Sequence, residues 1–472
     1  MKESRYRSRL PSLPAFSHEP AALRDYLGTA DRTARASPTS PDAVGALGVA
    51  YHANMFYEQA DRAYTLAEGL GGDWRWSYFR ALVHEARGEP AAVTTVLQDV
   101  VVRAPQFSPA WWRLGEAEFK LGRRDAAVKA FERARTLPEP PPEPWPGAPV
   151  RKAAAPVAAY AALGLARAAL AAGDAERARQ MLEDVMTVSP AFGPGMRLLA
   201  TAYTSLGRAG DAEGAARRSD RLPGYDPYVD PTFVLLARES RSPTFLLQQA
   251  AAADAGTNAA WREFMIRRAL ELDPDSADAM QELATLLRVL RRFDEALALL
   301  RRLEQKVPDD PRVVADIGRC LSGLRQYDEA EGVLRRALAS LDDANTRYDL
   351  GLVLDRTGRS AAAMNEYKLA LIRNPTHRDT LNNLGVAYAR AGRLAEAAAQ
   401  FERLVAADPA NPDAHTNLGA ILLSTGHAAR AEQEFRAALD IDPGNSVARD
   451  TLAKTNFPKK PADSAGQAPS LR

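Results

Sequence analysis

The chain of 472 residues has one cysteine, Cys320, so it cannot form a disulfide within itself. Cys320 lies among apolar residues at helical spacing, which predicts a small buried core residue rather than a reactive thiol. Histidine is also scarce, with only six residues. None of His377, His415 and His427 has a second strong ligand three or four residues further on, so we predict no metal site.

Neither sign of charge is in excess, because 61 lysines and arginines balance 60 aspartates and glutamates to a net charge of +1. This balance argues against broad electrostatic binding to nucleic acids or membranes. No apolar run approaches the roughly 18 residues of a membrane-spanning helix, and residues 1–16 lack the apolar core of a signal peptide. We therefore expect a cytoplasmic location for the chain as written. A periplasmic or envelope location is the alternative if an export signal lies upstream of the given start.

Sequence signatures of catalysis are missing as well. The chain has no G-x-x-x-x-G-K-[ST] phosphate loop, no G-x-G-x-x-G after a strand, and no G-x-S-x-G, H-E-x-x-H or C-x-x-C motif. No strands are evident, which argues against the doubly wound folds that host most nucleotide chemistry. We therefore predict that the protein is not an enzyme and that it binds no cofactor.

The chain does contain a repeat, which is clearest between residues 378 and 445. Corresponding residues in two successive copies are Leu384-Gly385 and Leu418-Gly419, Gly392 and Gly426, Ala397 and Ala431, Phe401 and Phe435, and Pro409 and Pro443. The members of each pair are 34 positions apart. This period and these residues resemble the tetratricopeptide repeat (TPR), which is a helix-turn-helix unit.

The spacing of small and turn-forming residues that recurs in the two copies has a physical explanation. Gly385 and Ala397 are small, so two antiparallel helices can approach each other closely at these positions. Gly392 supplies the turn between the helices, and the residue before Pro409 cannot continue the second helix. One helix pair cannot bury its apolar face alone, so neighbouring pairs must stack. The resemblance therefore implies an all-α fold, a right-handed superhelical solenoid of antiparallel helix pairs.

The repeat pattern also predicts how the chain is organised. We expect an N-terminal lead and helix over residues 1–40, about three repeats over 41–137, a proline-rich loop over 138–156, about two repeats over 157–223, an irregular insertion over 224–242, a regular block of about six repeats over 243–445, a capping helix over 446–457 and a disordered tail over 458–472.

One position of the repeat suggests a binding surface. In TPR superhelices the first helix of each repeat lines the inner groove, and the residue before the Leu-Gly pair faces into it. The corresponding residues here are Glu282, Asp316, Asp349, Asn383 and Asn417. Such a row resembles the ladder with which superhelical TPR proteins bind the backbone of an extended peptide, since these side chains donate or accept hydrogen bonds. The alternative is an ordinary solvated helix face.

Neighbouring positions are expected to add selectivity for the side chains of the peptide. These residues are Gln281, Arg319, Tyr348 and Asn382. The first helices of the regular block carry no lysines on these faces, which argues against the carboxylate clamp that binds chaperone C-termini. The acidic part of the row favours a neutral or basic peptide. We expect a protein or peptide partner, no nucleic acid, no membrane span and a monomeric chain.

Aromatic residues in the N-terminal half offer a second possible surface. Trp74, Trp76, Trp111 and Trp112 are candidates for an aromatic strip that binds peptides. Trp111 occupies a packing position of the repeat and is expected in the core, whereas Trp112 is expected to be more open.

Four N-terminal segments resemble a group of bacterial TPR proteins, several of which are exported. These segments are residues 52–64, 73–82, 225–230 and 245–254. The sequence as a whole therefore predicts a non-catalytic scaffold or adaptor that binds an extended peptide in its groove. The alternative is an accessory subunit of an enzyme or of an envelope or export complex, docked through the two irregular insertions.

Overall fold

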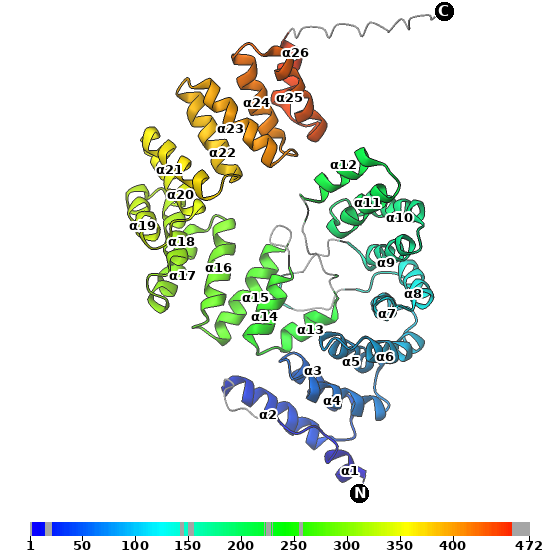
Figure 1. Ribbon diagram of the computed structural model, residues 1–472. Helices are drawn as coiled ribbons and strands as arrows, with labels where there is room; N and C mark the ends of the chain where they lie inside the picture. Colours follow the sequence, from blue (N-terminus) through cyan, green and yellow to red (C-terminus); the bar gives the residue numbers. More distant parts are fainter. Residues whose placement is uncertain are drawn as a thin grey trace, which may run out of the picture. The chain divides into compact units, whose positions relative to one another are not determined.

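The computed structural model describes residues 2–14, 21–141, 146–149, 155–220, 222, 228, 230–253 and 258–455. Within these ranges the regular secondary structure consists of 26 helices and no strand (Figure 1). The predicted all-α solenoid of helix pairs is confirmed. The chain forms two compact units, residues 1–286 and 287–472, which are described separately.

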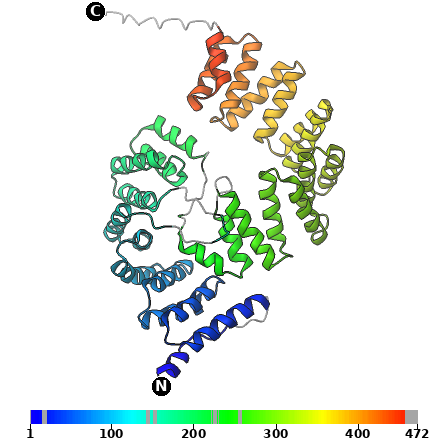
Figure 2. The same ribbon diagram turned by 180° about the vertical axis from the view of Figure 1, so that it is seen from behind.

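The first unit contains helices that pair in chain order, as Figure 2 also shows from behind. They are α1 (Lys2–Arg7), α2 (Ala21–Ala36), α3 (Pro41–His52), α4 (Tyr57–Gly69), α5 (Trp74–Ala86), α6 (Pro90–Arg103), α7 (Ser108–Lys120), α8 (Arg124–Thr136), α9 (Val157–Ala171), α10 (Ala175–Val188), α11 (Gly193–Ser205), α12 (Ala209–Ser219), α13 (Thr232–Glu239), α14 (Pro243–Ala251) and α15 (Ala259–Leu272). The boundary between the units lies inside α16 (Ala277–Val289).

The second unit continues the same pattern with more regular spacing. Its helices are α17 (Phe293–Lys306), α18 (Pro311–Gly323), α19 (Tyr327–Ser340), α20 (Ala344–Arg356), α21 (Ser360–Arg373), α22 (Arg378–Arg390), α23 (Leu394–Ala407), α24 (Pro412–Ser424), α25 (Ala428–Ile441) and α26 (Ser446–Lys454). The short helix α26 occupies the place predicted for the capping helix. The predicted tail over 458–472 lies outside the described residues.

Small residues allow the two helices of a pair to pack closely, as the repeat pattern predicts. A Cβ atom on Gly385 of α22 would lie 2.8 Å from the Phe401 ring of α23, and one on Gly318 of α18 would lie 2.6 Å from Leu334 of α19. The turn between the helices requires a positive φ, which is 73° at Gly392. At the corresponding turn Arg325 adopts a φ of 62°, which is strained for a residue with a Cβ.

The predicted irregular insertion over 224–242 and the helices that follow it belong to one compact unit. Helices α14 and α15, at the start of the predicted regular block over 243–445, lie in the first unit with the repeats before them. The reason is that α13, inside the predicted irregular insertion, contacts α3, while Arg268 of α15 donates to the carbonyl of Arg238 at 2.6 Å. Residues 224–227 and 229 of this insertion, and 142–145 and 150–154 of the proline-rich loop, are among those the structure leaves undescribed.

Candidate functional site

The predicted row of acids and amides in the second unit lies on successive first helices. Capping residues fix its register, because each capping residue lies six positions before its row residue. Asp310 caps α18, Asp343 caps α20, His377 caps α22 and Asn411 caps α24, each accepting a hydrogen bond from a backbone N–H of the first turn. The row residues Asp316, Asp349, Asn383 and Asn417 follow at one common position. Helices α18 and α20 contact each other directly, which places this position on the side where the first helices converge.

The α18–α20 end of the row is a network of charged side chains. Arg319 donates from Nη1 to Asp316 Oδ1 at 2.7 Å and from Nε to Asp349 Oδ2 at 2.5 Å, and so joins the two helices. Arg288 Nη2 lies 3.4 Å from the same Asp316 oxygen. The side chains of Asp316 and Asp349 are only 10% and 16% exposed. Two carboxylates are thus matched by two guanidinium groups.

Burial gives Asp349 an unusual protonation equilibrium. Loss of hydration raises the pKa of its carboxyl group to about 6, although Arg319 acts in the opposite direction. The charge at the α18–α20 end of the row therefore changes in the pH range between 5 and 7.

The α22–α24 end of the row is built from amides. Asn383 donates from Nδ2 to the Tyr348 hydroxyl at 3.2 Å, Asn382 donates to Asn383 Oδ1 at 3.2 Å, and Asn417 donates to Asn382 Oδ1 at 3.1 Å. All four side chains are partly exposed. Each amide has two N–H groups and two lone pairs on its oxygen, so these contacts leave hydrogen-bonding capacity for a ligand.

The two ends meet because Tyr348 and Asp349 are consecutive residues of α20. The structure therefore brings together seven of the nine predicted site residues: Asp316, Arg319, Tyr348, Asp349, Asn382, Asn383 and Asn417. We call this set the polar row. The other two, Gln281 and Glu282, belong to α16 within the first unit. Glu282 is half exposed, and its carboxylate pairs with Arg262 Nη2 of α15 at 2.6 Å.

The first unit contains a contact region that sequence reasoning missed. Residue 228 and residues 230–242, which we call the strap, follow α12 and lie against helices much earlier in the chain. Asp230 Oδ2 accepts hydrogen bonds from the Tyr78 hydroxyl at 2.5 Å and from Arg113 Nη2 at 2.8 Å and Nε at 3.1 Å. Its other oxygen accepts from Thr232 N and Oγ1 at 3.0 and 2.6 Å. The Asp230 side chain has no exposed surface, and that of Arg113 is only 8% exposed.

Aromatic contacts hold the beginning of the strap. The Tyr228 ring lies edge-on to Trp112 of α7 and Tyr160 of α9, with centroids 5.3 and 5.7 Å away. The Tyr228 hydroxyl donates to Glu139 Oε1 at 2.9 Å. Trp112 is therefore a contact for the strap, while Trp111 packs beside the core cluster around Phe131.

The end of the strap reaches the N-terminal helices. Helix α13 contacts α3, and Tyr26 of α2 donates to Glu239 Oε2 at 2.9 Å. Asn54, just after α3, accepts a hydrogen bond from the backbone N–H of Arg241 at 2.6 Å. The strap thus runs from α9 back to α2, opposite to the order of the helices it crosses.

The strap contacts use the same repeat positions as the polar row. Arg113 directly precedes Leu114-Gly115, so it corresponds to Asp349, Asn383 and Asn417. Trp112 corresponds to Tyr348 and Asn382. The signal for this site was therefore present in the sequence, but only as a bulky aromatic and a cation where the C-terminal repeats carry amides and acids. A cavity of about 170 Å³ lies beside Arg113 and is lined by Glu85, Glu89, Pro90, Val93, Glu116 and Lys120, among others.

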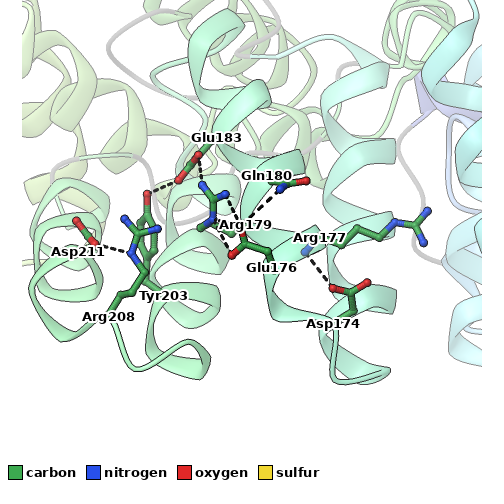
Figure 3. A network of polar contacts seen from close by, with 9 residues as sticks. All are labelled: Asp174, Glu176, Arg177, Arg179, Gln180, Glu183, Tyr203, Arg208 and Asp211. Atoms are coloured by element: carbon green, nitrogen blue, oxygen red, sulfur yellow. Dashed lines mark hydrogen bonds and ion pairs between the residues drawn. The ribbon is translucent and has the colours of Figure 1, made fainter.

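A third polar cluster, on α10 to α12, has the character of a surface ion-pair network (Figure 3). Arg179 pairs with Glu176 and Glu183, and Tyr203 donates to Glu183 Oε1 at 2.7 Å. Arg208 pairs with Asp211 at 2.7 Å. Glu176 and Asp211 are half exposed, and exposed ion pairs contribute little to stability or recognition. This cluster joins helices and is not a candidate site.

Other chemistry finds no support in the described part of the chain. Cys320 is fully buried, as predicted for a core residue, and burial raises the pKa of its thiol to about 11. Among the described residues, no group of three or more His, Cys, Asp or Glu side chains is arranged to hold a metal ion. Helices long and apolar enough to cross a membrane are likewise absent from these ranges.

Comparisons with known proteins agree with the helix-pair architecture. Family models described as "Tetratricopeptide repeat" match residues 95–149 and 382–446, residues 246–315 and 290–353, and residues 159–184. Together these matches extend over more than half of the chain. No curated protein matches the chain at a significant level.

Several solved structures are similar to parts of the chain. The TPR protein YrrB, described as having an unusual peptide-binding site, is 23% identical, with 40% of this chain and 97% of YrrB covered and a TM-score of 0.32. The Cut9–Hcn1 tetramer of APC/C is 13% identical, with coverages of 85% and 93% and a TM-score of 0.41. Pseudomonas aeruginosa pilF is 18% identical, with coverages of 45% and 97% and a TM-score of 0.39.

Proposed function

Because the chain belongs to the tetratricopeptide repeat family, whose members are generally non-catalytic protein-interaction scaffolds, we propose that it binds an extended peptide segment of a partner along the polar row. The observation that carries this proposal is the continuity of the row over α18, α20, α22 and α24. Seven side chains at three repeat positions are joined by hydrogen bonds while the amides remain partly exposed.

The spacing of the row suits an extended peptide. Packed helices lie about 8–10 Å apart, and an extended chain rises about 3.3 Å per residue. Each first helix therefore meets the ligand about once every three residues, and four helices span about ten residues. Amides at this spacing complement backbone N–H and C=O groups without selecting a particular sequence.

The charges of the row narrow the class of ligand. Asp316 and Asp349 are matched by Arg319 and Arg288, so the α18–α20 end carries little net charge. This balance removes much of the acidic character that favoured a basic peptide. The proposed ligand is an extended segment without strong net charge, whose backbone contacts the amides Asn383 and Asn417.

A pull-down from lysate of the source cell, analysed by mass spectrometry, tests this function. The Asn383→Ala/Asn417→Ala double variant is compared with wild type and with a control, Asn365→Ala/Gln433→Ala. The control residues are exposed polar side chains on the second helices α21 and α25. We expect a partner that is retained by wild type and control and lost by the row variant. Its affinity for the purified proteins should fall at least about tenfold, corresponding to two hydrogen bonds.

Retention of every partner by the row variant would refute the row as the binding surface. Docking through the insertions would then be the remaining alternative, but the strap in the second insertion is largely occupied by contacts with its own unit. Buried Asp230 and Ser240 are unavailable to another protein. The alternative therefore depends on the proline-rich loop over 138–156.

A further inference from the structure

The strap contacts the first unit in the way that a peptide ligand contacts a repeat groove. Its first residues, Tyr228 and Asp230, have no regular secondary structure and are held by side chains of α5, α7 and α9. One of its backbone N–H groups, that of Arg241, is bound by the Asn54 amide. Side-chain recognition by α5, α7 and α9 and backbone recognition by the turn after α3 thus occur along the same strap.

The groups that recognise Asp230 are also held by contacts among the helices themselves. Tyr78 is buried on α5, and Arg113 is buried on α7, where Glu85 pairs with the opposite side of the guanidinium group. Arg113 Nε also donates to the Tyr78 hydroxyl at 2.9 Å, so the two donors support each other. A carboxylate at the position of Asp230 completes this arrangement, because a buried guanidinium group requires nearby acceptors.

We propose that the inner face formed by α3, α5, α7 and α9 is a second peptide-binding site. Its ligand is a peptide that has an aromatic residue two positions before an aspartate, followed by a short helix. The strap, with Tyr228, Asp230 and helix α13, occupies the site within the same chain. The aromatic residue fills the space between Trp112 and Tyr160, and the aspartate binds Tyr78 and Arg113. This site lies on the first unit and does not depend on the polar row.

Tethering explains how the experiment must be designed. A covalently linked segment has an effective concentration on the order of millimolar, so a free peptide competes poorly with the wild-type strap. The Asp230→Ala variant weakens the strap but leaves Tyr78, Trp112 and Arg113 in place. The probe is a fluorescein-labelled synthetic peptide with the sequence of residues 228–242, added to the full chain and followed by fluorescence anisotropy.

We expect the peptide to bind the Asp230→Ala protein at least about tenfold more tightly than wild type, as loss of the tethered competitor requires. A peptide with alanine in place of the aspartate should bind this variant at least about tenfold more weakly. Adding Arg113→Ala to the Asp230→Ala protein should abolish binding of the original peptide. Circular dichroism establishes that each variant is folded.

Absence of binding to a folded Asp230→Ala protein would overturn the proposal, as would binding that is independent of the peptide's aspartate. Either result would show that the strap is a permanent part of the folded first unit and not a displaceable ligand. If Asp230→Ala does not fold, hydrogen exchange of the wild-type chain replaces it, with the peptide at millimolar concentration. Faster exchange of residues 230–242, with α5 and α7 still protected, supports displacement, and unchanged exchange refutes it.

Discussion

The first and second units use the same repeat positions for opposite purposes. In the first unit, Tyr78, Trp112 and Arg113 contact the chain's own strap, and Tyr78 and Arg113 are buried. In the second unit, the corresponding Tyr348, Asn382 and Asn383 hydrogen-bond to each other and remain partly exposed. One scaffold therefore supports both a filled face and an open one.

The difference follows from the size and charge of the side chains. Aromatic rings and a guanidinium group require apolar contacts and an acceptor, which an extended segment of the same chain supplies. Short amides satisfy part of their hydrogen-bonding capacity with neighbours on adjacent helices. The residue types at two repeat positions thus distinguish a face that contacts the strap from one whose amides remain partly exposed.

Two spectroscopic probes distinguish the units in a single protein. All six tryptophans precede residue 287, and the only cysteine, Cys320, is buried in the second unit. Tryptophan fluorescence therefore follows unfolding of the first unit, and reactivity of the thiol follows unfolding of the second. Each probe can be followed in a urea titration of the full chain.

The largest expected effect is the loss of the arginine that holds the strap. Arg113→Ala leaves the carboxylate of Asp230 buried without its cation, which costs about 3–5 kcal/mol of unfolding free energy. Arg319→Ala should cost only about 1–2 kcal/mol, because Asp316 keeps Arg288 and the pKa of Asp349 is already near 6. Tryptophan fluorescence measures the first loss and thiol reactivity the second. Equal losses of unfolding free energy in the two variants would contradict the difference between the strap contact of the first unit and the polar row of the second.

A change in the shared scaffold should affect both units alike. Gly115→Ala and Gly385→Ala each place a Cβ against a phenylalanine ring, at 2.5 Å from Phe131 and 2.8 Å from Phe401. Overpacking of this kind costs about 1–3 kcal/mol. Urea titration of each variant tests the prediction with the probe for its unit. A loss confined to one unit would mean that the helix pairs are not equivalent.

The pH dependence of stability should identify the open row through Asp349. Burial is the main cause that raises the pKa of the Asp349 carboxyl group to about 6 in the folded protein. Between the pKa of this group in the unfolded chain and pH 6, the folded state therefore binds a proton that the unfolded state does not bind. Its contribution to stability is therefore present below about pH 4 and is lost as the pH rises to between 6 and 7. Relative to Asp349→Asn, wild type should lose stability in the second unit over this range. Parallel pH profiles for the two proteins would contradict the raised pKa.

The smallest effect concerns a turn. Arg325 has a φ of 62°, and glycine at this position should stabilise the second unit by about 1 kcal/mol. Met55 has a φ of 68° at the corresponding turn of the first unit, but its sulfur also contacts Ser242 Oγ of the strap at 4.0 Å. Met55→Gly should therefore gain less than Arg325→Gly when both are measured by urea titration. An equal gain would show that this strap contact has no energetic weight.

Much of the architecture could be predicted because it is local and periodic. A 34-residue period specifies helix pairs, and the residue before the Leu-Gly pair identifies Asp316, Asp349, Asn383 and Asn417 as one row. Their hydrogen bonds follow from neighbouring repeats, which the sequence pattern aligns. Glu282 shares the position but lies in the part of α16 that belongs to the first unit.

The strap could not be predicted by the same reasoning. The contact between Tyr78 and Asp230 spans 152 positions, and no periodic pattern relates the two residues. The second insertion has turn-forming prolines that indicate an interruption, yet they do not indicate where its side chains bind. Only Trp112 and Arg113, directly before Leu114-Gly115, signalled that this face differs from the C-terminal row.

The strap also determines the order in which the protein can be completed during synthesis. Helix pairs that contact only their neighbours can pack as they leave the ribosome, but the Asn54–Arg241 contact joins residues 187 positions apart. At about 5–20 residues per second, roughly 10–40 s separate the synthesis of these two residues, and roughly 6–23 s separate that of Arg113 and Asp230, which are 117 positions apart. During the second interval Arg113 lacks the carboxylate that the strap supplies. Translation therefore creates a period in which this contact is not yet formed in every newly made chain.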